Sequence, residues 1–220
     1  AFRTPAIMVS CSFACTLAFM YLVPQELQRG LGMSSTLAGL LMLPGGIVNA
    51  VCTLMAGRLF DRHGARVLVW IGVVMAAIGG ALFFAIGVDS GVVLFLAAHI
   101  IVMVGIPFIQ QSAQSAALKS LPGRMAADGS TILNTMQQVC GAIATAVATC
   151  LLGLGQTGYA AGGGANAAQG FVDGSRYGYM FGLVLVAIVL VFSFMLKGGK
   201  EEPKLVPVQV DDGAVESLAV

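Results

Sequence analysis

The chain consists of long apolar runs separated by short polar connectors. Six runs are long and apolar enough to cross a bilayer as a helix, which takes about 20 mostly apolar residues. They cover residues 5–24, 36–56, 67–87, 92–113, 128–153 and 178–196. Because a helix satisfies its own backbone polar groups in lipid, the pattern predicts an all-α, polytopic membrane protein whose six transmembrane helices form one bundle over residues 1–196.

The connectors carry capping and turn residues. Ser34 and Ser35 stand before the second run and are good helix N-caps. The sequence VDSG at 88–91 is typical of a tight turn. Residues 154–177 are rich in Gly and Ala, so we expect a flexible connector there. Residues 197–220 are charged and contain Pro, which predicts a disordered cytoplasmic tail.

The basic residues predict the orientation of the bundle. Lys and Arg concentrate in cytoplasmic loops. If the six runs alternate in direction, only Arg29 and Arg176 fall on one side. The other side holds Arg3, Arg58, Arg62, Arg66, Lys119, Arg124, Lys197, Lys200 and Lys204. We therefore expect a multi-pass protein of the cell inner membrane with both ends of this segment in the cytoplasm.

Composition narrows the class of protein further. Apolar residues make up 58% of the chain and charged residues 10%, whereas a soluble domain carries about 25% charged residues. The mean hydropathy of +0.92 agrees with a membrane protein. A net charge of +1 predicts no nucleic-acid partner. The five cysteines show no metal-binding spacing, and no catalytic set or nucleotide loop is visible. We therefore expect no cofactor, no metal and no enzymatic activity.

The most polar segment between runs is GRLFDRHGAR at 57–66. Its residues of interest are Gly57, Asp61, Arg62, Gly64 and Arg66. Glycines permit a tight turn or a close backbone approach, and Asp61 can accept hydrogen bonds from helix-start amides or pair with an arginine of a neighbouring helix. Such a pair would hold the cytoplasmic side of the bundle closed until the helices move. The alternative is that these charges only set the topology.

Four sequence elements resemble a known family of transporters. The pattern G-x-L-x-D-R-x-G-x-R at 57–66 resembles the loop signature of the major facilitator superfamily. The connector P-x-x-L-Q-x-x-x-G at 24–32 and the run A-G-L-x-x-L-P-G-G at 38–46 resemble its fourteen-helix drug:proton antiporters. Residues 129–147, GSTILNTMQQVCGAIATAV, are similar to a later segment of that group. The chain departs from the group at Gln137, where an arginine is usual.

The resemblance implies a fold, an activity and partners. The six runs would be the last six of fourteen helices, forming the C-terminal half bundle. The implied activity is proton-coupled export of hydrophobic or cationic drugs by alternating access, in which this bundle rocks against an N-terminal transmembrane half that the chain lacks. The implied partners are the lipid bilayer, a small hydrophobic substrate and protons. A non-transporting fragment, or a scaffold subunit that binds another helical bundle, is the alternative.

Polar side chains inside the runs are candidates for a substrate cavity, since such groups usually face protein or water. These candidates are Asn49, Gln110, Asn134, Gln137 and Gln138. The alternative is packing between helices, in which amides hydrogen-bond across the contact without touching substrate.

His99 is the titratable residue farthest inside a run, and an imidazole titrates near neutral pH, as proton coupling requires. The competing interpretation is a neutral histidine packed against a neighbouring helix. We place Glu26, Asp89 and Asp173 in the outer connectors and Asp128 at the start of the fifth run. The sequence therefore predicts no acidic proton carrier deep inside this bundle.

Overall fold

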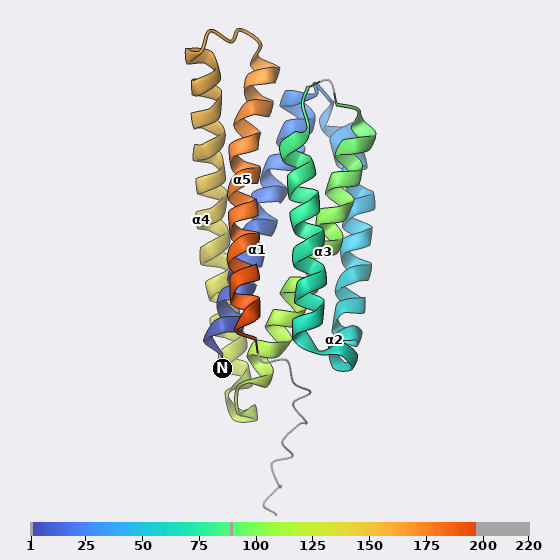
Figure 1. Ribbon diagram of the computed structural model, residues 1–220, viewed down its shortest axis with the longest axis vertical. Helices are drawn as coiled ribbons and strands as arrows, with labels where there is room; N and C mark the ends of the chain where they lie inside the picture. Colours follow the sequence, from blue (N-terminus) through green and yellow to red (C-terminus); the bar gives the residue numbers. More distant parts are fainter. Residues whose placement is uncertain (1, 89, 197–220) are drawn as a thin grey trace, which may run out of the picture.

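The computed structural model describes residues 2–88 and 90–196, and within these the chain is helical without a strand (Figure 1). The expected all-α class is confirmed. The helices are α1 (Arg3–Gln25), α2 (Ser35–Ala85), α3 (Val92–Lys119), α4 (Ala126–Ala161) and α5 (Ala167–Phe194). A π-helical turn, η1 (Glu26–Gly30), extends α1, and a short 3-10 turn, η2 (Gly123–Met125), precedes α4. Within this described part of the chain, five helices are long and apolar enough to cross a membrane.

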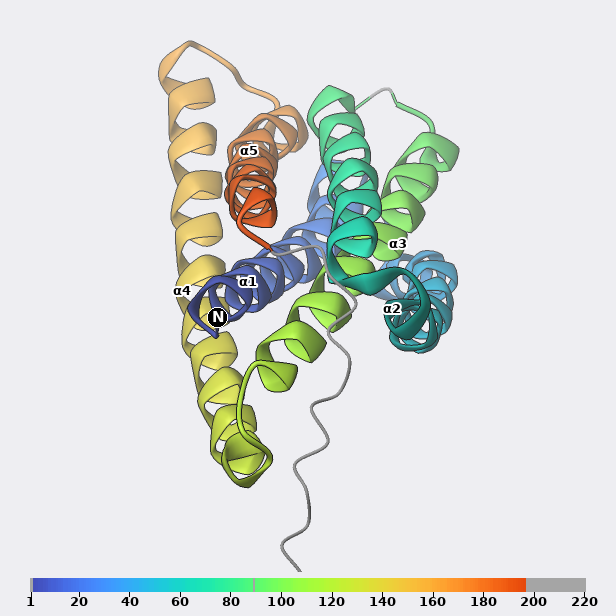
Figure 2. The ribbon, with the colours of Figure 1, turned by 60° about the horizontal axis from the view of Figure 1, so that its bottom comes forward.

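The longest helix, α2, is divided at Gly64. A straight helix of 51 residues would measure about 76 Å, more than twice the roughly 30 Å of a bilayer core. Gly64 has φ 77° and ψ 167°, a conformation outside the helical region. Only glycine adopts a positive φ of this kind without steric cost. The chain reverses there, at the lower end of α2 in Figures 1 and 2, so α2 has two antiparallel arms, residues 35–63 and 65–85.

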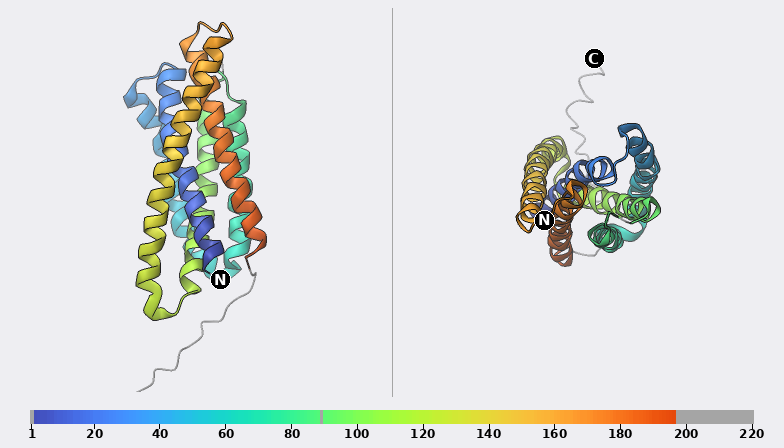
Figure 3. Two further views of the ribbon diagram at one scale, coloured as in Figure 1. Left: turned by 90° about the vertical axis from the view of Figure 1, so that its left-hand side faces the viewer. Right: turned by 90° about the horizontal axis from the view of Figure 1, so that it is seen from above.

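The elements form one bundle whose connectors alternate between its two ends, as the runs predicted. The N-terminus, the Gly64 turn and η2 lie at the lower end in Figure 1. The connectors at 31–34, at 86–88 with 90–91, and at 162–166 lie at the upper end. Seen from above, α1 lies between the pair α4–α5 and the pair α2–α3 (Figure 3).

One helix start was predicted correctly and one connector wrongly. Ser34 caps α2, its Oγ accepting from the backbone N–H of Leu37 at 3.3 Å. The flexible connector expected at 154–177 is helical except for residues 162–166. Small residues in this segment let two helices touch, because a Cβ on Gly155 would lie 2.5 Å from the Gly174 Cα. The tail expected at 197–220 lies outside the described residues.

Glycines also bring the second arm of α2 against α3. A Cβ on Gly72 would lie 2.6 Å from the carbonyl oxygen of Gly105. A Cβ on Gly105 would lie 2.5 Å from the backbone nitrogen of Ala76. These distances leave no room for side chains, so the two backbones are in direct contact. Close approach of this kind is how helices associate inside lipid.

Substitution at this contact is the sharpest test of the packing. Gly72→Ala places a methyl group against backbone atoms that cannot rotate away, so it should destabilise the protein by about 1–3 kcal/mol. Gly46→Ala, in the other arm of α2, meets no atom within 4 Å and should be neutral or slightly stabilising. The measurement is the thermal unfolding midpoint of the intact purified protein in detergent. Equal midpoints for the two variants would contradict the close α2–α3 contact.

Candidate functional site

An ion pair connects two helix ends at the lower end of the bundle. The Lys119 Nζ at the C-terminus of α3 donates to Asp61 Oδ1 at 3.0 Å. The same ammonium group lies 4.4 Å from the centre of the Phe60 ring. The polar segment at 57–66 therefore contains a residue that bonds to another helix. The partner is a lysine, whereas we expected an arginine or helix-start amides.

The other residues of this segment differ in what they contribute. Gly64 makes the turn. Gly57 is exposed and lies within helical backbone, and a Cβ there would meet no atom within 4 Å, so the close approach expected at Gly57 does not occur. Arg62 and Arg66 are exposed and make no ion pair with any described residue.

Two of the predicted cavity residues meet between α3 and α4. Gln110 Nε2 donates to Gln137 Oε1 at 3.3 Å. The Gln137 side chain is buried, with 5% of its surface exposed. Its own Nε2 finds no hydrogen-bond acceptor among the described residues. A buried amide that is half satisfied is uncommon in a protein interior, and this one lies where two helices of the bundle converge.

The remaining predicted cavity residues make no hydrogen bond to this pair among the described residues. Asn49 Nδ2 lies 3.5 Å from the backbone oxygen of Met103 on α3 and 3.7 Å from its Sδ. Asn134 and Gln138 are exposed on α4. The sequence grouped Gln137 with them because all three fall on one broad helix face. The structure places Gln137 on the buried side of that face and the other two on its outer side.

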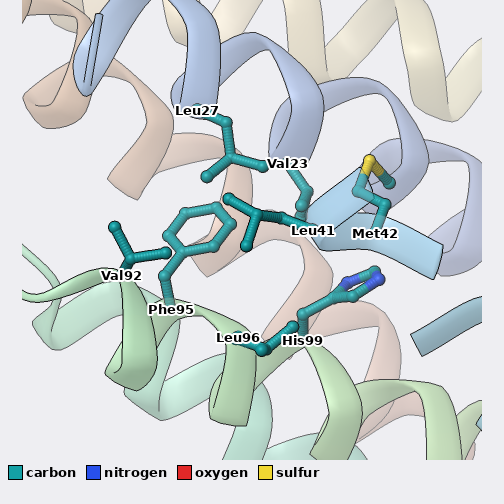
Figure 4. Close-up of a pocket in the computed structure, with 8 residues that line it drawn as sticks. All are labelled: Val23, Leu27, Leu41, Met42, Val92, Phe95, Leu96 and His99. Atoms are coloured by element: carbon teal, nitrogen blue, oxygen red, sulfur yellow. The ribbon is translucent and has the colours of Figure 1, made fainter. Parts of the chain in front are cut away.

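His99 lies in an apolar pocket that leaves no volume for a water molecule (Figure 4). The pocket is lined by Val23, Leu27, Leu41, Met42, Val92, Phe95, Leu96 and His99. The ring is pressed against α2, since a Cβ on Gly45 would lie 2.4 Å from its Nε2. His99 Nδ1 has no hydrogen-bond partner among the described residues. This environment favours the packing interpretation of His99 over proton transfer.

A buried carboxyl group, that of Glu26, was not expected from the sequence. Glu26 is 1% exposed, although we expected it in an outer connector. The placement was wrong because the helix does not end at Gln25 but continues as the π-helical turn to Gly30. Glu26 accepts a hydrogen bond from the hydroxyl of Tyr179 on α5.

The burial of Glu26 could have been predicted from the spacing of the small and apolar residues around it. Leu22, Val23, Leu27 and Gly30 are buried and extend the inner face of α1 past Pro24. Their spacing is that of one helix face, and Glu26 lies on it. Gly30 contacts α5, because a Cβ there would lie 3.0 Å from Val172 Cγ2.

A half-buried charged pair lies on the same helix as Tyr179. Arg176 donates to Asp173 Oδ1 at 3.1 Å and to the backbone oxygen of Ile86 at 3.3 Å. Arg176 thereby ties α5 to the C-terminal end of α2. Gln169 also donates to Asp173, at 3.1 Å.

Comparison with known proteins shows what the chain resembles. Residues 1–145 match the profile of the Major Facilitator Superfamily. The chain is 37% identical over 210 residues to the lincomycin resistance protein LmrB of Listeria innocua, covering 90% of this chain and 43% of that protein. It is 34% identical over 196 residues to the protein of the same name in Bacillus subtilis. It is 29% identical over 133 residues to the multidrug resistance protein B homolog of Mycobacterium tuberculosis. The chain spans less than half the length of these curated relatives.

The ion pair between Asp61 and Lys119 should contribute little to stability. Both side chains are mostly exposed, at 70% and 57%, and exposed pairs typically contribute about 0.2–1 kcal/mol. Asp61→Asn should therefore lower the unfolding midpoint only slightly, and 0.5 M NaCl should have a similarly small effect on the wild type through charge screening. A large fall in the midpoint of Asp61→Asn would mean that the pair is a structural element of the fold.

Proposed function

The chain belongs to the major facilitator superfamily, and we propose that it forms the C-terminal six-helix half of a fourteen-helix drug:proton antiporter. The observation that carries the proposal is the ion pair between Asp61 and Lys119. It joins the Gly64 turn to the end of α3 at one end of the bundle. Alternating access needs contacts at each end that break and re-form as the two bundles rock. An exposed ion pair suits this role because it costs little to open.

The two arms of α2 support the proposal of six transmembrane helices. The shorter arm, residues 65–85, would span about 31 Å, enough to cross a bilayer core of about 30 Å. With six spans, the start of α1 and the end of α5 fall on the same side of the membrane. Six of the eight Lys and Arg residues of the described chain lie near that side and favour a cytoplasmic location. They are Arg3, Arg58, Arg62, Arg66, Lys119 and Arg124, whereas Arg29 and Arg176 lie toward the other side.

The outer surfaces of α2 and α4 support an N-terminal bundle as the partner. The first arm of α2 exposes Leu40, Leu43, Ile47 and Leu54 at 56%, 56%, 64% and 71%. In our proposal, part of this surface faces lipid and part faces the N-terminal half. Asn134 and Gln138, exposed on α4, and Asn49 on α2 would contribute polar groups to a cavity between the halves, together with the pair Gln110–Gln137.

We propose hydrophobic or cationic drugs as the substrates, with proton movement as the driving reaction. The names of several relatives refer to lincomycin resistance or to multidrug resistance and efflux. Those with lincomycin in their names align with about nine-tenths of this chain. A scaffold subunit without transport activity is not favoured, because no feature of the described residues indicates a scaffold rather than a transporter. Carriers of this kind perform no chemical conversion of substrate.

The test of the proposal is transport by the full-length protein in proteoliposomes. An imposed pH gradient should drive movement of lincomycin or of the hydrophobic cation ethidium against its concentration gradient. Asp61→Asn should reduce this transport severely at normal membrane level, because the variant lacks the charge that Lys119 binds. The exchange of both residues, Asp61→Lys with Lys119→Asp, should restore part of it. Arg124→Gln, exposed at the same end, is the matched control and should transport normally.

Transport that survives Asp61→Asn would show that the segment at 57–66 serves only topology or stability. Absence of pH-driven movement of both compounds by the wild type would reject the proposal for these substrates.

The proposed orientation predicts which positions a membrane-impermeant thiol reagent can reach in intact cells. Single cysteines at Gly91 and at Ala165, in a background without native cysteines, should be labelled from outside. A cysteine at Gly123 should be protected until the membrane is made permeable. The two glycines have no atom within 4 Å of a built Cβ, and all three positions are exposed, so the substitutions should not disturb the fold. Labelling of the cysteine at Gly123 in intact cells would invert the orientation.

A further inference from the structure

Glu26 is the buried carboxyl group of this bundle. The other acidic side chains of the described chain, Asp61, Asp128 and Asp173, are exposed or half-buried. Glu26 is 1% exposed and lies in η1, packed against α1, α2 and α5. A carboxylate in an apolar interior is costly unless it is paired or takes up a proton, so this residue needs a physical explanation.

The immediate surroundings of Glu26 are aromatic and apolar. Its hydrogen-bond partner Tyr179 is fully buried, and the Tyr179 ring stacks on Phe83 with centroids 4.8 Å apart. Phe19 packs against the same two rings, at 5.4 Å from Tyr179 and 5.7 Å from Phe83. Water therefore has little room to solvate the carboxyl group from this side.

The elements around Glu26 offer few charges. On α5, Arg176 is the cation within electrostatic range among the described residues, and it already binds Asp173 and the Ile86 carbonyl. On α1, the titratable groups toward this end are Cys15 and Tyr21, and the charged residue Arg3 lies at the opposite end. The charged residues of α2 lie between 58 and 66, also at the opposite end. On η1 itself, Arg29 is exposed. Glu26 thus has no cation bonded to it within the described chain.

The bond to Tyr179 can persist in both charge states of the carboxyl group. The carboxylate accepts from the tyrosine O–H. The protonated acid can still accept on its carbonyl oxygen, or can donate its own O–H to the tyrosine oxygen. Uptake of one proton forms one O–H bond and neutralises one negative charge, without breaking the contact between α1 and α5. A buried polar group that stays satisfied in both states can exchange a proton without disrupting its surroundings.

A hollow that opens to solvent is lined in part by Arg176, one helical turn from Tyr179 on α5. Its volume is about 480 Å³, and it lies at the upper end of the bundle. It is lined by Phe84, Gly155, Gly158, Tyr159, Asp173, Arg176, Tyr177 and Met180. Asp173 and Arg176 make one wall of it polar. The hollow brings solvent to Asp173 and to Arg176, whose charge acts on Glu26, although neither Glu26 nor Tyr179 lines it.

We propose that Glu26 is a proton-binding residue of the transport cycle in this half of the protein, with Tyr179 as its positioning residue. The carboxylate takes a proton from water at the end that holds the 480 Å³ hollow and loses it in another state of the cycle. The inference rests on the proposed proton-coupled transport. It assigns to the bundle the acidic residue that the sequence analysis did not find.

The test compares Glu26→Gln, Tyr179→Phe and the control Arg29→Gln in the full-length protein. Glutamine has nearly the size of glutamate and can accept from Tyr179, but it cannot titrate. Glu26→Gln should lose transport driven by a pH gradient while equilibrium binding of ethidium stays within about twofold of the wild type, a change below 1 kcal/mol. Infrared difference spectra on acidification should show a carboxylic C=O band in the wild type that Glu26→Gln lacks. Arg29→Gln, an exposed charge in the same turn, should keep both the transport and the band.

Tyr179→Phe distinguishes positioning from simple packing. The ring remains, so the stack on Phe83 is kept, but the charged carboxylate loses its donor. The pH at which transport is half-maximal should therefore move upward by about one unit or more. If Glu26→Gln fails to reach the membrane, the pH shift of Tyr179→Phe still tests the role of Glu26. Loss of packing alone would lower transport without moving its pH profile.

Three results would overturn the inference. The first is pH-driven transport by Glu26→Gln at the wild-type rate, which would leave the proposed function intact. The second is an infrared band that is identical in the wild type and Glu26→Gln. The third is an unchanged pH profile in Tyr179→Phe. If the wild type itself moves neither lincomycin nor ethidium under a pH gradient, the proposed function fails and this inference fails with it.

Discussion

Close contact between small residues holds this bundle together, because lipid provides no hydrophobic drive for apolar helices to associate. In water, burying a leucine stabilises a fold, but lipid tails solvate it equally well. Association inside the membrane relies instead on dispersion contacts, and these require the helices to approach closely. Gly72 and Gly105 bring the backbones of α2 and α3 together, and Gly155 and Gly174 do the same for α4 and α5. The aromatic cluster around Phe83 fills the space that remains between α1, α2, α3 and α5.

The lipid around the bundle also restricts where polar groups can lie, because lipid cannot form hydrogen bonds with them. Ionic residues of the Gly64 turn lie at an end of the bundle, where water solvates them and the pair Asp61–Lys119 is mostly exposed. Polar groups that remain inside have protein neighbours, as Gln110 has Gln137 and Glu26 has Tyr179. Burial without a full set of partners costs free energy, so residues kept there despite this cost, such as Glu26, point to function.

The two ends of the bundle use different chemistry to tie helices together. At the end with the Gly64 turn, an exposed ion pair joins α2 to α3 and is easily opened. At the other end, a buried hydrogen bond joins η1 to α5, and Arg176 joins α5 to the end of α2. A bundle that rocks against a second bundle needs one kind of contact that breaks readily and another that keeps its helices together. In the proposed cycle, the ion pair between Asp61 and Lys119 is the contact that opens, and the other end contains the proton-binding residue.

Much of the fold could be predicted from the sequence alone, because membrane-spanning segments are defined by local properties. Length and apolarity identified the helices, Gly64 and its neighbouring charges marked the reversal of the chain, and Ser34 marked a helix start. The predicted helix bounds were less accurate where one sequence pattern is compatible with both a loop and a helix. Gly- and Ala-rich residues near 155–174 are typical of loops, yet in lipid they also serve close helix packing, and here they are helical.

The membrane-spanning segments and the positions of the charged residues could be identified from the amino-acid sequence, because these depend on near neighbours along the chain. The pairing of helix faces depends on the three-dimensional packing. The packing paired Asp61 with Lys119, 58 positions away, and Glu26 with Tyr179, 153 positions away. It also buried Gln137 and left Asn134 and Gln138 exposed, although the three residues share one broad face of α4. Which residues become partners depends on the rotation of each helix about its axis. That rotation depends on the packing of all the helices together rather than on any single stretch of residues.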